Sequence, residues 1–280
     1  MGKIARSWEL VKASWAVLQA DKELIIFPVL STIAVTVVMI SFAVPMFLTG
    51  MFERGLFRVG GIPIAGIFLG FIFYTIQYTI IFYCNSALVG AAMIRLKGGD
   101  PTVGDGFAIA NKHLTSILGY ALLAATVGLI LRNIARRGVV GRIVASVFGL
   151  AWNIATFLAV PVLVVEGVGP IDAVKRSTQL LKKTWGEQLA GNIGIGAAFT
   201  LVFFAVVLVF AGALALAIPT NSATLIVGVV AVFVLAAVLL SLVGSALSAI
   251  YTAAVYRYAT EGDAGGMFAP ELVQAAFRSK

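Results

Sequence analysis

The feature that most constrains this chain is a long tract without any charged residue. From Gln188 to Tyr256 the sequence contains no Asp, Glu, Lys or Arg. Soluble domains carry about 25% charged residues, whereas only 11% of the 280 residues here are charged and 61% are hydrophobic. Only membrane-spanning segments tolerate such a tract, so the sequence predicts an integral membrane protein.

The apolar runs between charged residues predict about six spans, because each span needs about 20 apolar residues. The runs are continuous and lack the alternation of a barrel wall, so the predicted fold class is an all-α, polytopic transmembrane helix bundle. Pro219, Asn221 and Ser222 indicate a turn that divides the charge-free tract. Pro161 is expected to kink the fourth span, since it deprives the Phe157 carbonyl of its usual donor. The predicted spans are residues 24–48, 60–94, 115–132, 143–165, 189–217 and 224–256.

Most lysines and arginines lie in the N-terminal segment, after the second and fourth spans, and at the C-terminus. Because cytoplasmic loops carry an excess of these residues, both termini are predicted to be cytoplasmic in a multi-pass protein of the cell membrane. Four arginines between the third and fourth spans oppose this orientation: Arg132, Arg136, Arg137 and Arg142. The formal charge of +8 is attributed to topology and anionic lipid, and no nucleic-acid partner is expected.

A short phrase occurs twice, in residues 6–15 and 176–185, each time just before a long apolar run. The shared positions are Arg6, Ser7, Leu10, Lys12 and Trp15, which recur as Arg176, Ser177, Leu180, Lys182 and Trp185. A weaker third copy lies at 105–119. The pattern predicts a repeated plan of one interfacial helix followed by two spans. The alternative explanation is that the two copies are unrelated membrane-surface helices whose sequences converged on the same residues. Within one membrane domain the units would be about 1–94, 101–165 and 170–258, with a cytoplasmic tail at 259–280.

The first copy of the phrase is predicted to form an amphipathic helix. Ile4, Trp8, Val11, Trp15 and Leu18 share one helical face. A basic helix with tryptophan on its apolar face is suited to the headgroup plane, with lysine stems reaching toward water. The candidate lipid-headgroup contacts are Arg6, Lys12, Trp15, Arg176, Lys182 and Trp185.

Uncharged polar side chains lie inside the predicted spans. Such amides and hydroxyls usually hydrogen-bond between helices, and a polar cavity is the alternative. Gly66 and Gly70, like the small residues around Ser245, favour close helix contact within the chain or with a second copy or another membrane protein. The candidate polar intramembrane residues are Gln77, Asn85, Asn153, Asn192, Ser241 and Ser245.

Residues typical of catalysis are scarce. His113 is the single histidine and Cys84 the single cysteine, so neither a zinc-ligand spacing nor a Ser-His-Asp set stands out. No catalytic residue, cofactor or metal site is therefore expected. The leading hypothesis is a non-enzymatic role through interaction with membrane lipid or with partner proteins. The alternative is a transporter or channel with a path lined by the intramembrane Asn, Gln and Ser residues.

The amphipathic helix, the paired spans and the Asp/Pro-led stretch Pro170–Trp185 together resemble uncharacterised six-span prokaryotic membrane proteins. These are similar to the membrane domain that accompanies some glycerophosphoryl diester phosphodiesterases. The resemblance implies fold and membrane location. It implies no catalytic residue, because the phosphodiesterase chemistry of those relatives belongs to a separate soluble domain.

Overall fold

The computed structural model describes residues 3–48, 64–185 and 194–275. These residues form helices joined by short turns and contain no strand, which confirms the predicted all-α fold. In chain order the elements are α1 (Lys3–Ala20), the 3-10 turn η1 (Lys22–Ile25), α2 (Ile26–Leu48), α3 (Ile64–Leu96), α4 (Val103–Lys112), α5 (Leu114–Ala135), α6 (Gly138–Ala155), α7 (Ala159–Glu166), α8 (Pro170–Trp185), α9 (Gly194–Ala217), η3 (Ile218–Thr220), α10 (Ala223–Glu261) and α11 (Pro270–Ala275).

Among the described residues, 6 helical segments are long and apolar enough to cross a membrane, which confirms the predicted number. The fourth segment combines α6 and α7. At ~1.5 Å per residue, α3 and α10 are each about 50 Å or longer, so they exceed a ~30 Å hydrocarbon core. The segments are Lys22–Leu48, Phe68–Leu96, Leu114–Ala135, Gly138–Glu166, Thr200–Thr220 and Ala223–Glu261.

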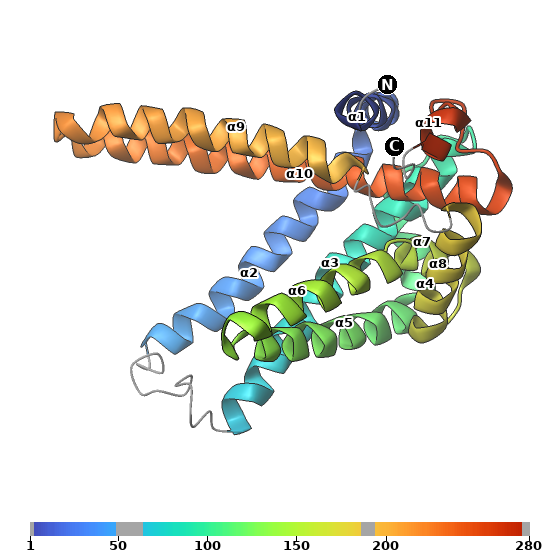
Figure 1. Cartoon of the computed structure of the whole chain (residues 1–280), viewed down its shortest axis with the longest axis horizontal. Coiled ribbons are helices and arrows are strands. Elements are labelled where there is room, and N and C mark those ends of the chain that lie inside the picture. The colour runs from blue at the N-terminus through green and yellow to red at the C-terminus, as the bar shows by residue number, and fades with distance from the viewer. Residues whose placement is uncertain (1–2, 49–63, 186–193, 276–280) are drawn as a thin grey trace.

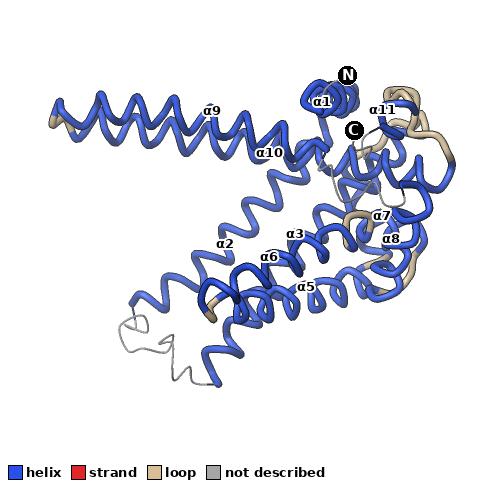
Figure 2. The backbone as a smooth tube through the Cα atoms, in the orientation of Figure 1, coloured by secondary structure: helices blue, strands red, loops and turns tan. Residues whose placement is uncertain are grey.

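The long helices fan out from one end of the molecule (Figure 1). Helices α9 and α10 form a long hairpin that leads away from the others, while the hairpin of α5 and α6 lies alongside α3. The shorter helices α1, α4, α8 and α11 gather at the end where the described chain begins and finishes (Figure 2). This end therefore joins the sequence-distant parts of the fold.

The core lies at the same end. Its fully buried side chains include Leu88 of α3, Leu163 of α7, Ile250 of α10 and Leu10 of α1. The far parts of the long helices leave most of their apolar side chains exposed or half-buried instead, and few or none in these parts of α9 and α10 are buried. Exposure of this kind carries no penalty in a bilayer, because lipid tails are as apolar as leucine.

The fourth span breaks where the sequence predicts a kink. Helix α6 ends at Ala155 and α7 begins at Ala159, so Pro161 lies in the first turn of α7. Proline fits this position because the first N–H groups of a helix have no carbonyl partner within it. The N–H of Leu158, at the start of α7, donates to the hydroxyl of Ser177 on α8 at 3.0 Å. A side chain from another helix thus caps the break.

The span ends also have local causes. Asn221 adopts a left-handed conformation (φ 51°) and the Ser222 hydroxyl accepts from the Leu225 N–H, so the predicted turn separates α9 from α10. Helices α3, α7 and α10 are each followed closely by a glycine with positive φ, namely Gly98, Gly167 and Gly262. Glycine suits this helix end because it has no Cβ to clash.

Candidate functional site

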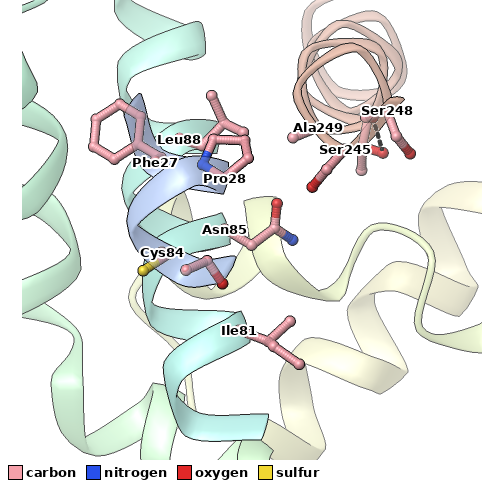
Figure 3. Close-up of a pocket in the computed structure, with 11 residues that line it drawn as sticks. Phe27, Pro28, Ile81, Cys84, Asn85, Leu88, Ser245, Ser248 and Ala249 are labelled. Carbon is pink, nitrogen blue, oxygen red and sulfur yellow. Dashed lines mark hydrogen bonds between the residues drawn. The ribbon is translucent and has the colours of Figure 1, made fainter. Parts of the chain in front are cut away.

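A cavity of about 220 Å³ lies between α2, α3 and α10 (Figure 3). Asn85 projects from α3 toward Ser245 and Ser248 of α10. Phe27 and Leu88 supply apolar wall at the end nearer the core. On α10 the polar side chains occupy one face, since Ser245, Ser248 and Thr252 recur at three- and four-residue spacing.

A second cavity of about 440 Å³ lies between α3, α5, the fourth span and α10. Asn85 and Thr252 line this cavity as well as the first, so the two cavities adjoin at these side chains. The lining of the second cavity includes the aromatic side chains Tyr78, Tyr120 and Trp152 beside aliphatic and small residues. Its size falls within the ~300–1,000 Å³ typical of small-molecule sites.

The depth of the cavities follows from helix geometry. Asn85 precedes Arg95 on α3 by about 15 Å of helix at ~1.5 Å per residue. Ser245 precedes Arg257 on α10 by about 18 Å on the same basis. If both arginines mark the interface, Asn85 and Ser245 lie near the middle of a ~30 Å hydrocarbon core. None of the residues that line either cavity is charged.

The sequence-predicted polar residues differ in where the structure places them. Asn85, Asn153 and Ser245 line the cavities. Gln77 is buried elsewhere and donates from Nε2 to the Val35 carbonyl at 3.4 Å, linking α3 to α2. Ser241 is exposed and lines neither cavity, and Asn192 lies outside the described residues.

The amide of Asn85 has no hydrogen-bond partner among the described residues, although an amide offers two donors and an acceptor oxygen. The buried hydroxyls of Ser86 and Tyr251 also lack a described partner. In the larger cavity, by contrast, the Thr156 hydroxyl donates to the Trp152 carbonyl and is paired with the Tyr120 hydroxyl. Among the described residues, Asn85 is thus the unpaired amide where the two cavities meet, whereas Ser86 and Tyr251 line neither cavity.

Helix α1 presents two different faces. Leu10 and Val17 are 1% and 0% exposed and pack in the core, whereas Trp8 and Trp15 are 48% and 42% exposed. At ~100° per residue, Lys12 lies on the tryptophan side, where its Nζ contacts the Glu9 carboxylate at 2.9 Å. Trp8 and Trp15 of the predicted face therefore point away from the protein, but Leu18 of the same predicted face is buried. Lys12, expected off that face, lies beside the tryptophans. A second apolar face holds the helix in place.

The candidate headgroup residues of α8 differ in their surroundings. Lys182 is exposed. Arg176 is engaged within the protein, because its Nε donates to both oxygens of Glu166 at 3.0 and 3.1 Å. The hydroxyl of Tyr256 on α10 donates to the same carboxylate at 3.1 Å. The side chains of Arg6 and Trp185 lie outside the described residues.

Two arginines that the sequence reasoning treated only as topology signals join helix ends. Arg95 donates to Asp100 at 3.0 Å and to the Ala20 carbonyl at 3.0 Å, so it connects α3 with α1. Arg257 donates to Asp263 at 2.7 Å and also to the Leu96 carbonyl, so it connects α10 with α3. The sequence pattern that could have indicated this joining role is an arginine near the end of a span, followed shortly by glycine and aspartate.

Two titratable groups at this end are perturbed. Asp21 is buried between α1 and η1, and burial raises the pKa of its carboxyl while the charge of Arg95 opposes that rise. Burial also lowers the pKa of His113, with a further contribution from Lys112. The imidazole of His113 lies beside Gly167. Neither group touches the cavities, and the described residues contain no cluster of three potential metal ligands.

The family assignment rests on one comparison. A family model described as a family of unknown function, DUF6159, matches residues 64–266. The chain belongs to this family. The matched segment contains α3 and α10, which line both cavities, but it excludes α1 and α2. The first copy of the repeated phrase therefore lies outside the matched segment.

Searches of curated proteins and of solved structures each found no match. None of the comparisons links the chain to glycerophosphoryl diester phosphodiesterases, so that resemblance stays a prediction.

Proposed function

We propose that this protein acts non-enzymatically in the cell membrane, through contact between its basic interfacial helices and anionic lipid headgroups. The observation that carries the proposal is the orientation of α1. Its core face is closed by Leu10 and Val17, which leaves Trp8, Lys12 and Trp15 directed outward. Tryptophan and lysine together on an exposed face suit the boundary between hydrocarbon and headgroups.

The second copy of the phrase supports the same role and an internal repeat. Leu180 of α8 is buried as Leu10 is, and Lys182 is exposed as Lys12 is. Similar burial at these two pairs of positions favours duplication of an interfacial helix that precedes two spans, although Ser7 is half-buried where Ser177 is fully buried. The positive-φ glycines after α3, α7 and α10 favour three such units. On this proposal, residues 6–94 and 176–257 superpose.

Clustering at one end supports cytoplasmic termini. Helices α1, α4, α8 and α11 lie at the end that also holds Arg95, Arg257 and Lys97. The opposite end, at the turn between α5 and α6, holds Arg136 and Arg137. Because cytoplasmic loops carry an excess of lysine and arginine, this distribution supports a cytoplasmic position for the end with the short helices.

The test is the lipid that stays bound when the protein is purified from bilayers of phosphatidylcholine and phosphatidylglycerol. The variant Lys12→Gln/Lys182→Gln removes both outward lysines but leaves the Arg176–Glu166 pair intact. Each lysine near an anionic surface contributes about 1 kcal/mol, or about fivefold. The retained phosphatidylglycerol, measured by mass spectrometry, is therefore expected to fall several-fold.

The control is Lys97→Gln/Lys175→Gln, which removes the same formal charge from exposed lysines outside the two copies of the phrase; both are in surface ion pairs, as Lys12 is. This control is expected to retain phosphatidylglycerol nearly as the unaltered protein does. Equal losses in both double variants would show that net charge alone attracts the lipid, and would overturn the proposed contact by α1 and α8.

A second candidate function is a transporter or channel, favoured by the adjoining cavities at membrane depth. Asn85, Asn153 and Ser245 line them, while Gln77 and Ser241 do not take part. A solute-flux assay in proteoliposomes tests this candidate. Flux that is lost in an Asn85→Leu variant would support a path, and the absence of flux for small uncharged and charged solutes would argue against one.

A further inference from the structure

We infer that the adjoining cavities bind the uncharged, hydroxyl-bearing head of an amphiphile that enters from the bilayer. This site is separate from the headgroup contacts of α1 and α8, and it concerns binding whether or not the ligand crosses the membrane. Asn85 and Thr252, which line both cavities, are its centre.

The Asn85 amide is unpaired: it has no hydrogen-bond partner among the described residues, and it points into the cavity toward α10 (Figure 3). Asn85 is half-buried, and a polar group that meets hydrocarbon in place of water without a partner costs about 1–3 kcal/mol. An amide placed near mid-membrane therefore favours any occupant that supplies both a donor and an acceptor.

The linings of both cavities are uncharged. No Asp, Glu, Lys, Arg or His lines either cavity, so a charged head would have no opposite charge to meet it. Charged groups at this depth cost several kcal/mol unless they are paired. A hydroxyl group avoids this cost, and it can donate to the Asn85 carbonyl oxygen while accepting from an amide N–H or from the Ser245 hydroxyl.

The smaller cavity opens at its rim toward the surroundings of the protein. At the smaller cavity Ile81 is 40% exposed, and Ser245 and Ser248 are also exposed, so its rim faces outward between α3 and α10. The inner wall of Phe27, Leu88 and Ala249 is apolar. A cavity that opens at hydrocarbon depth and has a polar centre and apolar walls fits an amphiphile that enters laterally from the bilayer. It fits a solute that enters from water less well.

The probe is a diacylglycerol that carries a photoreactive diazirine on one acyl chain, added to phosphatidylcholine nanodiscs containing the full chain. Irradiation followed by peptide mapping is expected to label α3 and α10. Asn85→Leu, which keeps a similar volume without hydrogen bonds, is expected to reduce labelling about 10-fold. Thr252→Val is expected to reduce it by a smaller factor. Melting temperatures of both variants check that the fold is kept.

Two controls separate this site from others. Ser241→Ala, on the exposed part of α10, and Lys12→Gln/Lys182→Gln are each expected to leave the labelling unchanged. Loss of labelling in the lysine variant, or equal labelling in Asn85→Leu with an unchanged melting temperature, would overturn the inference. The headgroup proposal would stand or fall on its own lipid measurement.

Competition identifies the chemistry. Unlabelled diacylglycerol should displace the probe, whereas a triacylglycerol without a hydroxyl and a phosphatidic acid with a charged head should not. Displacement by either of these would overturn the assignment of an uncharged hydroxyl head. Displacement by free glycerol at low concentration would overturn entry from the bilayer and assign the cavities to a soluble polyol.

Discussion

At the scale of single residues, Ser177 has a role that its sequence position does not reveal. The sequence predicts a small polar residue on a membrane-surface helix, but its side chain is fully buried and accepts the Leu158 N–H. Ser14 of α1 is equally buried, yet its hydroxyl donates to Leu10 within its own helix. Two similar serines therefore differ in what their hydroxyls hold together.

This difference gives a prediction for Ser177→Ala. The change leaves the Leu158 N–H buried without its acceptor at the start of α7, which costs about 1–3 kcal/mol. The melting temperature in detergent is expected to fall by several degrees. Ser14→Ala is the matched control and should have a smaller effect, because the Leu10 carbonyl remains within a regular helix. Equal melting temperatures for both variants would contradict the role given to Ser177.

At the scale of elements, the joints between helix ends depend on a few charged side chains. Arg257 is the strongest example, since it bonds Glu261, Asp263 and the Leu96 carbonyl while its own side chain is only 14% exposed. It thereby connects two helices that are far apart in the sequence. Lys97 contacts the same Glu261 at 3.6 Å, but it is 54% exposed.

We predict that Arg257→Met weakens the joint between α3 and α10 by about 2 kcal/mol, because bonds to charged groups are worth about 1.5–3 kcal/mol. Lys97→Met should change stability by less than about 1 kcal/mol, since exposed ion pairs contribute little. Thermal unfolding in detergent compares the two variants. A Lys97→Met effect as large as that of Arg257→Met would show that the joint does not depend on the buried guanidinium.

At the scale of the whole molecule, the two ends differ in which helices they gather. Lys12 lies on α1 at the end with the short helices, and Arg137 lies in the turn between α5 and α6. Cys84 is the single cysteine, so a Cys84→Ala background can report on one introduced thiol at a time. A cysteine placed at each position in turn therefore tests the orientation of the protein and whether the membrane lies between the two positions.

We predict that Arg137→Cys in that background reacts with a membrane-impermeant maleimide on intact cells. Lys12→Cys should react only after the cells are permeabilised, because α1 is proposed to face the cytoplasm. The Cys84→Ala background should stay unlabelled. Reversed reactivity would contradict the proposed orientation, and labelling of both positions on intact cells would contradict a crossing between them.

Much of this architecture could be read from residue order because its causes are local. Runs of apolar residues bounded by charge predict the spans, Pro161 predicts the break in the fourth span, and Asn221 with Ser222 predicts the final turn. Hydrocarbon accepts only apolar residues with satisfied backbone groups, so length and composition decide these features. The helical period further indicates the outward tryptophans of α1.

The grouping of polar residues required the tertiary structure. Gln77 and Asn85 are both amides on α3, but the first bonds α2 and the second faces the cavities. Which one meets a neighbour depends on how α2, α5 and α10 pack around α3, and this is set by contacts distant in sequence. Arg176 likewise meets Glu166 only because α8 returns to the end of α7.

The residue order by itself thus determined that this chain enters a membrane as about six helices, since transfer of apolar surface depends on composition and length. Only the tertiary structure decided which polar groups are paired and which remain available at the junction of two cavities. The physical reason is that hydrogen bonds are short and directional. Their partners come from other helices, and a span carries no local signal of which neighbour it will face.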